Sequence, residues 1–103
     1  MMSGTLEKIF KKAAAGRFLI EFTDAGNRKR VAEPYGIFYS NEGILQLCCF
    51  QVSGYSKSGL LPNWRNPHLA SIQDIRILES TFVRRVSFEP GNHKIYPHWK
   101  FHI

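Results

Sequence analysis

The chain has 103 residues, of which 44% are hydrophobic and 14% aromatic, so it has enough apolar side chains for one folded domain and is not a disordered protein. It carries 14 lysines and arginines against 8 acidic residues, and the resulting net charge of +6 is spread along the whole chain. Such a surface attracts phosphates and other anions, although it also fits a merely soluble basic domain.

The first pattern along the chain is that of an amphipathic helix. Apolar side chains recur at the spacing of one helical face at Leu6, Ile9, Phe10 and Ala13. Gly16 suits the position after the last turn. We therefore predict a helix from about residue 5 to 15.

The period then changes to two, which is typical of strands. Residues 18–23 alternate between apolar and other side chains, and residues 24–27 have the composition of a turn. A second extended stretch runs from about Arg28 to Tyr39. Pro34 removes a hydrogen-bond donor from this stretch and Gly36 permits a sharp bend, so we expect the strand to kink or change its partner there.

A hairpin turn and a long loop follow. In the turn, residues 40–43, Gly43 can take a positive φ. Residues 44–52 form the next strand, and because its apolar side chains point both ways, we expect it to be covered on both faces. Residues 53–67 contain two glycines, two prolines and no sustained period, so they predict a long loop, and loops of this length in a compact domain are often functional.

Two ordered stretches complete the chain. Residues 68–80 predict a strand, in which Ile75 and Ile77 alternate with charged neighbours. Residues 82–88 and 93–103 flank a Glu-Pro-Gly-Asn turn, and we expect them to form a final β-hairpin over about residues 83–103.

The predicted fold is mainly β with one N-terminal helix. One helix followed by about five short, bent strands favours a small SH3-like or Sm-like β-barrel over about residues 17–82, with the C-terminal hairpin as an extension. We expect a single domain spanning residues 1–103. Its barrel should close around four aliphatic side chains, those of Leu45, Leu47, Ile75 and Ile77.

Three segments occur in an order that resembles the WYL domain family. They are RVAEPYGIFY (residues 30–39), NEGILQLCCF (residues 41–50) and HLASIQDIRILESTF (residues 68–82). In that family an Arg-Val-x-Pro segment leads into a hairpin whose second strand carries a Trp-Tyr-Leu triplet. A later Arg-Leu-x-Arg-Ile segment runs on to a closing phenylalanine. The resemblance covers roughly residues 6–82.

The chain departs from this family at the charged and aromatic positions. Leu45, Gln46 and Leu47 occupy the triplet, and residues 68–72 occupy the later segment without either of its arginines. Family members commonly follow a DNA-binding helix-turn-helix and are thought to sense nucleotides or nucleic acid through these positions. The resemblance therefore implies a diverged, stand-alone WYL-like domain whose partner is a nucleotide or single-stranded nucleic acid.

Four candidate binding residues lie in the segments that carry the resemblance. Arg30 matches the family's arginine and offers a planar donor fork to phosphate, unless it only solvates an exposed strand. Gln46 and His68 can hydrogen-bond a base or a sugar, and Ser71 can bond a phosphate. Alternatively, Gln46 is a satisfied polar residue of the core and His68 is a satisfied residue at a strand end.

Three further candidates are aromatic or cationic. Trp64 or Tyr39 can stack on a base while Arg65 holds phosphate beside it, which is a common way to bind single strands. Alternatively, Trp64 is a lid packed over the end of the barrel.

The sequence predicts neither a metal or cofactor site nor an enzyme. His93, His98 and His102 lie close together, but no cysteine or carboxylate stands at ligand spacing beside them. No serine or cysteine lies in a nucleophile-elbow motif, and the acidic residues form no recognisable pair for acid–base catalysis. We therefore expect a non-enzymatic binding or regulatory module.

A second hypothesis belongs to another functional class. Residues 93–103 contain aromatic side chains near the end of the chain, and an extended segment of this kind can add to the sheet edge of another protein. The alternative is thus a protein-interaction module that pairs with a partner protein or forms a homodimer.

Cysteine usage and hydropathy predict a cytoplasmic protein without a membrane partner. Cys48 and Cys49 are adjacent in an apolar run, so they point to opposite faces and suit a buried, reduced pair. No apolar run approaches the roughly 18 residues that a membrane span needs. In the first 17 residues the lysines follow the apolar residues, which is the wrong order for a secretory signal.

Overall fold

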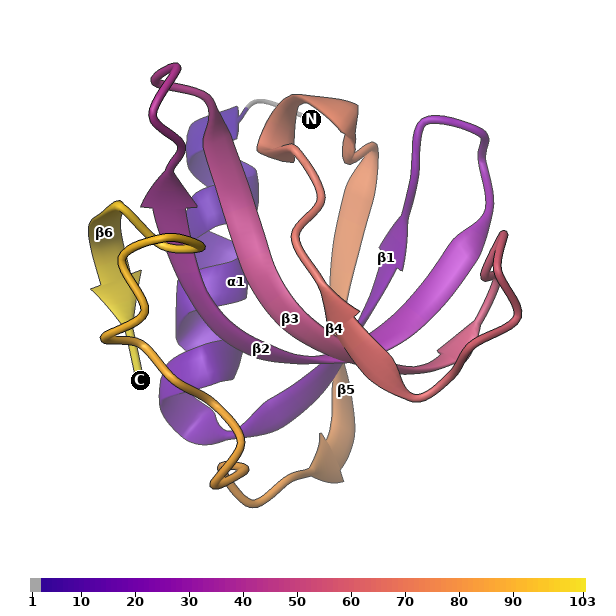
Figure 1. Cartoon of the computed structure of the whole chain (residues 1–103). Helices are drawn as coiled ribbons and strands as arrows, with labels where there is room; N and C mark the ends of the chain where they lie inside the picture. The colour runs from indigo at the N-terminus through magenta and orange to yellow at the C-terminus, as the bar shows by residue number, and fades with distance from the viewer. Residues whose placement is uncertain (1–2) are drawn as a thin grey trace.

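A computed structural model describes residues 3–103, and an antiparallel sheet dominates it (Figure 1). Helix α1 (Ser3–Gly16) comes first. The strands are β1 (Phe18–Thr23), β2 (Lys29–Tyr39), β3 (Leu45–Gly54), β4 (Asn63–Arg65), β5 (Asp74–Thr81) and β6 (His98–His102), and a 3₁₀ turn, η1 (Leu69–Ser71), precedes β5. The prediction of a mainly β protein with one N-terminal helix is confirmed, and the helix begins two residues earlier than expected.

The six strands form one sheet in the order β4-β3-β2-β1-β5, with β6 paired to β2. All of these pairings are antiparallel. Within residues 3–103 no ladder joins β4 to β5, so the sheet is open and the expected closure of a barrel is not seen.

The break at Pro34 and Gly36 does what the sequence predicted. On one side β2 pairs with β3 along its length, with a register shift between Pro34 and Gly36. On the other side its first half pairs with β1 and its second half, from Gly36 onward, pairs with β6. Gly36 is needed because a Cβ atom there would lie 2.6 Å from the Phe101 carbonyl oxygen.

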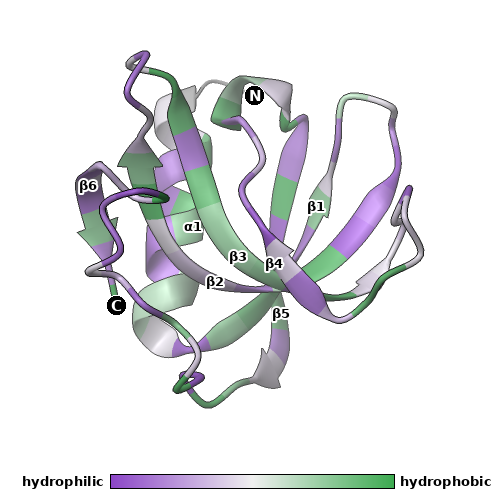
Figure 2. Cartoon of the chain, viewed as in Figure 1, coloured by the Kyte–Doolittle hydropathy of each residue, from purple (hydrophilic) through white to green (hydrophobic). Residues whose placement is uncertain are grey.

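Two clusters of buried side chains lie on opposite faces of β2 and β3, as the alternation of β3 predicted. Figure 1 shows α1 behind these strands and the C-terminal segment in front of them, and Figure 2 shows how apolar residues follow β3. The helix-side cluster includes Phe10, Ile20, Phe22, Ile37, Leu47, Cys49 and Ile75, with Leu45 and Ile77 packed against it. The aromatic cluster includes Tyr35, Phe38, Cys48, Phe50, Phe82, Phe88 and Tyr96, with Trp64 and Trp99 packed against it.

The four aliphatic side chains expected at the centre of the fold do pack together. Leu47 and Ile75 are buried in the helix-side cluster, while Leu45 and Ile77 are partly buried against it. The core prediction is therefore confirmed even though the sheet stays open.

The predicted C-terminal hairpin is wrong. Residues 82–97 form no strand, and β6 pairs with β2 instead. The reason is packing, because Phe82, Phe88 and Tyr96 enter the aromatic cluster at irregular intervals, which a regular strand cannot match. The edge of β2 beyond the end of β1 is free to take β6.

The stretch between β3 and β5 is also more ordered than predicted. The expected loop of residues 53–67 contains β4, which pairs with β3 so that Trp64 lies opposite Phe50. The expected strand of residues 68–80 divides into η1 and β5.

Candidate functional site

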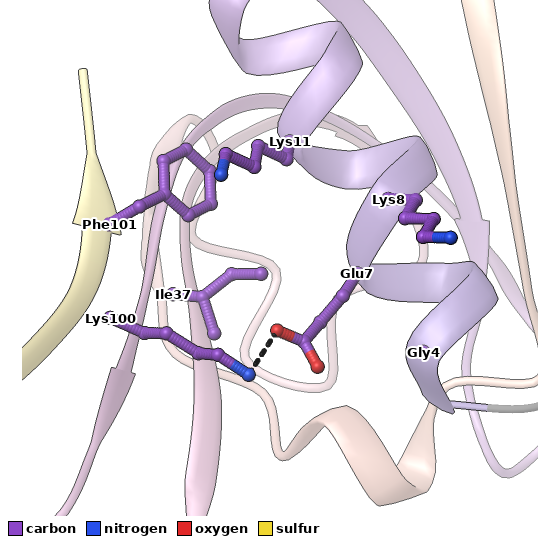
Figure 3. Close-up of a pocket in the computed structure, with 7 residues that line it drawn as sticks. All are labelled: Gly4, Glu7, Lys8, Lys11, Ile37, Lys100 and Phe101. Atoms are coloured by element: carbon purple, nitrogen blue, oxygen red, sulfur yellow. Dashed lines mark ion pairs between the residues drawn. The ribbon is translucent and has the colours of Figure 1, made fainter.

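A hollow of about 380 Å³ lies between the start of α1 and the C-terminal strand β6, and we call it the lysine hollow (Figure 3). It is lined by Gly4, Glu7, Lys8 and Lys11 of α1, Ile37 of β2, and Lys100 and Phe101 of β6. Three lysines and one glutamate thus line the hollow together with two apolar side chains.

The helical period explains why α1 contributes these side chains. Gly4, Glu7 and Lys11 are spaced by three and four residues, so they share one face of the helix. This face lies beside the apolar one that packs on the sheet. Phe101 joins the two sides of the hollow, because its ring meets that of Phe10 edge-on at 6.3 Å between centroids.

An ion pair spans the hollow. The Lys100 Nζ atom lies 2.7 Å from Glu7 Oε1, and this hydrogen bond raises the pKa of the Lys100 amine. Lys11 places its Nζ 5.6 Å from the centre of the Phe101 ring. Figure 3 shows Glu7 and Lys100 turned toward each other across the hollow, while the Lys8 amine points away from Lys100. Among residues 3–103, neither Lys8 nor Lys11 forms an ion pair.

Such an arrangement can bind an anion. Lysine amines are compact charges that attract phosphate or carboxylate, while an apolar floor takes the uncharged part of a ligand. The carboxylate of Glu7 acts against an anion but is itself neutralised by Lys100. The volume lies near the lower end of the roughly 300–1,000 Å³ that small-molecule sites occupy, so the hollow suits a small ligand.

The structure places Arg30 away from this hollow and gives its guanidinium internal partners. Its Nε and Nη2 atoms lie 3.0 and 2.9 Å from Asp24 Oδ2, and Nη1 donates to Gln51 Oε1 at 3.4 Å. Burial alone would raise the pKa of Asp24, but hydrogen bonds from the Arg28 backbone and from Arg30 outweigh it, and the pKa is lowered. The donor fork proposed for phosphate is occupied by a carboxylate.

Gln46, His68 and Ser71 come together at one end of β3. Gln46 and His68 form a β-bridge, and Gln46 Nε2 donates to the Asn66 carbonyl at 2.7 Å. Ser71 Oγ donates to the His68 carbonyl at 2.8 Å. The Gln46 side chain therefore agrees with the alternative of a satisfied polar residue, and Ser71 likewise bonds to the backbone.

The remaining candidates lie apart from one another. Trp64 is half-buried against Phe50 and stacks on Phe88, so it is a packed aromatic residue. Arg65 points elsewhere, and its Nη2 donates to Ser56 Oγ and to the Leu60 carbonyl, both at 3.2 Å. Tyr39, 37% exposed, ends β2. The seven predicted binding residues thus do not line one common hollow, and their contact with a ligand stays a prediction.

Two further hollows lie elsewhere on the molecule. One, of about 230 Å³, is lined by Trp64, Asn66, Ser87, Glu89, Asn92, Ile95 and Tyr96. The other, of about 290 Å³, is lined by Glu21, Thr23, Lys29, Asp74 and Arg76, whose opposite charges balance. Neither Arg30 nor His68 lines any of these three hollows.

Sequence reasoning missed the residues of the lysine hollow. The pair Glu7 and Lys11, four residues apart on a predicted helix, was a visible signal for a charged helical face. Lys100 gave no such signal, because its position beside α1 depends on the pairing of β6 with β2.

Within residues 3–103, no three His, Cys, Asp or Glu side chains lie close enough to hold a metal ion, and no helix is long and apolar enough to cross a membrane. No protein-family model, curated protein or solved structure matches the chain. The resemblance to the WYL family therefore stays a prediction.

Proposed function

We propose that this protein is a non-enzymatic binding module for a small phosphate-bearing ligand, in the first instance a nucleotide, and that the lysine hollow is its site. The observation that carries this proposal is the charge around the hollow. Three lysines against one carboxylate leave a surplus of two positive charges beside an apolar floor. The start of α1 adds to this field at Gly4, since free N–H groups at the beginning of a helix favour anions.

Each residue that lines the lysine hollow has its own role in this proposal. Lys11 attracts the phosphate, Lys8 adds to the positive field from farther away, and Lys100 shares its amine between the ligand and Glu7. Ile37 and Phe101 pack against the base or the sugar. Glu7 repels the phosphate and so lowers the affinity, while it also holds β6 against α1 through Lys100.

We also propose that the fold is an SH3-like or Sm-like barrel that is open between β4 and β5. Support comes from the way the chain returns from β4 to β5 across the end of β3. The Leu47 amide donates to the Pro67 carbonyl at 2.9 Å, and Gln46 bridges to His68. These contacts take the place of a direct ladder between the two outer strands.

The binding proposal is tested by calorimetric titration with ATP, AMP, inorganic phosphate and a short oligothymidylate at two salt concentrations. Lys11→Gln and Lys100→Gln should each weaken nucleotide binding by about three- to tenfold, as expected for partly exposed charge contacts. Glu7→Gln should tighten it by a similar factor. Higher salt should weaken binding in every case.

Lys12→Gln is the matched control, because Lys12 is exposed on the same helix and does not line the hollow. Its loss should leave the affinity nearly unchanged. A Lys12→Gln effect as large as that of Lys11→Gln would show that only the general positive field attracts the ligand. If oligothymidylate binds with the same affinity to all four variants, the site is an open nucleic-acid surface and not the lysine hollow. If no ligand binds at low salt, the proposal is wrong.

The alternative function, a protein-interaction module that uses residues 93–103, has less support. β6 is already paired with β2, and Trp99 and Phe101 are half-buried within their own molecule.

A further inference from the structure

The hollow of about 230 Å³ lies on the opposite face of the sheet from the lysine hollow, and we call it the indole hollow. Trp64 and Asn66 form its wall on the side of β4, and residues 87–96 of the C-terminal segment form the other wall. Its volume is below the roughly 300 Å³ at which sites for whole drug-sized molecules begin, so it can enclose one ring but not a nucleotide.

One polar atom at this hollow has no partner. The Asn66 Oδ1 atom is buried and accepts no hydrogen bond within the part of the chain that the structure describes. The backbone of the same residue is fixed, because its carbonyl accepts from Gln46 Nε2 at 2.7 Å. A buried acceptor without a donor costs free energy, and a small turn of the carboxamide into the hollow would let a bound molecule supply the donor.

A donor stands beside this acceptor. Trp64 lies in β4 and Asn66 directly follows that strand, and both residues line the hollow. Among residues 3–103, no hydrogen bond leaves the Trp64 indole N–H, whereas Trp99 Nε1 donates to the Pro90 carbonyl at 2.7 Å. Two residues that line the indole hollow thus carry one acceptor and one donor without a partner among residues 3–103.

The charge around the indole hollow excludes anions. Glu89 is the charged side chain among those that line it, and it is exposed and makes no ion pair within the described residues. A phosphate would be repelled here, in contrast to the lysine hollow. The chemistry favours a neutral or cationic ring that carries both a donor and an acceptor.

We propose that the indole hollow binds an amino-substituted heteroaromatic ring of the kind found in adenine and cytosine nucleosides. The exocyclic amine donates to Asn66 Oδ1, a ring nitrogen accepts from the Trp64 indole N–H, and the sugar stays outside. This site is separate from the lysine hollow, so the inference does not rest on the proposed function.

The test is an NMR titration of the full chain with adenosine, followed through the indole and carboxamide N–H signals. Adenosine should shift the Trp64 indole signal and leave that of Trp99 in place. Inosine has a carbonyl where adenosine has the amine and a protonated N1 where adenosine has an acceptor, so it should bind more than about tenfold more weakly, as expected when both hydrogen bonds are lost. AMP should bind here no more tightly than adenosine, because exposed Glu89 lines the hollow and repels a phosphate.

Three variants complete the experiment. Asn66→Leu should weaken adenosine binding about tenfold without lowering the stability, because the lost acceptor had no partner in the free protein. Ser87→Tyr, at an exposed position on the rim, should fill the hollow and abolish binding. Asn41→Leu, exposed in the turn before β3, is the control and should leave binding unchanged.

Two results would overturn this proposal. One is the absence of any adenosine-dependent shift of the Trp64 indole signal at millimolar concentration. The other is an Asn66→Leu variant that binds adenosine as tightly as the original chain. AMP and the Lys11 variant test binding at the lysine hollow, whereas adenosine and the Asn66 variant test binding at the indole hollow. Either proposal can therefore be wrong without the other.

Discussion

At the scale of single residues, Cys48 and Cys49 are neighbours in β3 whose side chains lie in different clusters. The Cys48 thiol lies 3.4 Å from the Tyr96 hydroxyl, and Cys49 Sγ lies 3.5 Å from the Arg65 carbonyl oxygen. Burial raises the pKa of Cys48 to about 12 and raises the pKa of Cys49 as well. Since the thiolate is the reactive form, both thiols should be inert near neutral pH.

The same burial predicts that the protein loses stability in alkali. The unfolded chain gives up its thiol protons near the ordinary pKa of 9.0, while the folded chain keeps them up to about pH 12. The unfolded state therefore binds fewer protons in this range, so the free energy of unfolding falls as the pH rises from about 9. Each thiol should contribute about 1.4 kcal/mol per pH unit. Tyr35, whose pKa burial raises to about 12, should add to this loss above about pH 10.

Urea unfolding at pH 8.0, 9.5 and 10.5, under reducing conditions, measures this loss. The two thiols together make the free energy of unfolding fall with pH between pH 9 and 10, and Cys48→Ala should remove about half of their share of this fall. An unchanged slope in Cys48→Ala would mean that the thiol is not shielded in the folded chain.

At the scale of elements, a clasp of three polar side chains fastens the segment after β5 to β2. Arg85 Nε and Nη2 donate to the two carboxylate oxygens of Glu33 at 2.9 and 3.0 Å. The Tyr35 hydroxyl donates to Glu33 Oε1 at 3.1 Å and accepts from the Arg85 amide at 2.9 Å. The guanidinium also lies 4.0 Å from the centre of the Phe50 ring. Residues 82–97 thus hold their place without a strand ladder.

Breaking this clasp should destabilise the protein. Glu33→Gln replaces a carboxylate that is 7% exposed and leaves Arg85 without its partner. We expect the free energy of unfolding to fall by about 1–3 kcal/mol. This is less than the loss expected for a fully buried ion pair, because Arg85 is partly solvated. Urea unfolding measures it, with exposed Glu79→Gln as the control. In the double variant with Arg85→Gln the losses should not add, and full additivity would show that the two residues do not act together.

The elements that could be predicted from the sequence are those with a local signal. The apolar period of residues 6–13 and the break at Pro34 and Gly36 follow from the chain itself, and both were predicted. β4 has three residues and no period to detect, and the pairing of β6 depends on a free edge formed by β2, 60 residues earlier in the chain. The sequence alone could not decide whether Arg30 binds a ligand or an internal carboxylate, because its partner Asp24 comes beside it only through the fold of the turn.

The same limit applied to the candidate site. The lysine hollow joins residues 4–11 to residues 100–101, and no local pattern connects them. Trp64 was predicted as a stacking residue and proves to line a hollow, but Asn66 was not singled out, because an unpaired carboxamide becomes visible only when its neighbours are known. Net charge pointed to anions without telling where they bind.

At the scale of the whole molecule, β6 closes a sheet edge that another chain could otherwise pair with. It covers the edge of β2 from Gly36 to Tyr39. Its aromatic side chains meet the two clusters, since Phe101 packs on Phe10 and Trp99 packs on Phe38. A sheet edge and two aromatic surfaces that would attract another chain are thereby closed from within.

We therefore expect the full chain to be a monomer of 11.9 kDa in light scattering after size-exclusion chromatography. A chain ending at Pro97 should lose about 2–4 kcal/mol of stability in urea unfolding, because two half-buried aromatic side chains are removed. It should also self-associate, because the edge of β2 is uncovered. His98→Ala, an exposed change within β6, should alter neither mass nor stability. The opposite result, a dimeric full chain that becomes monomeric when residues 98–103 are removed, would contradict this prediction. Residues 93–103 would then be the segment through which an interaction module pairs.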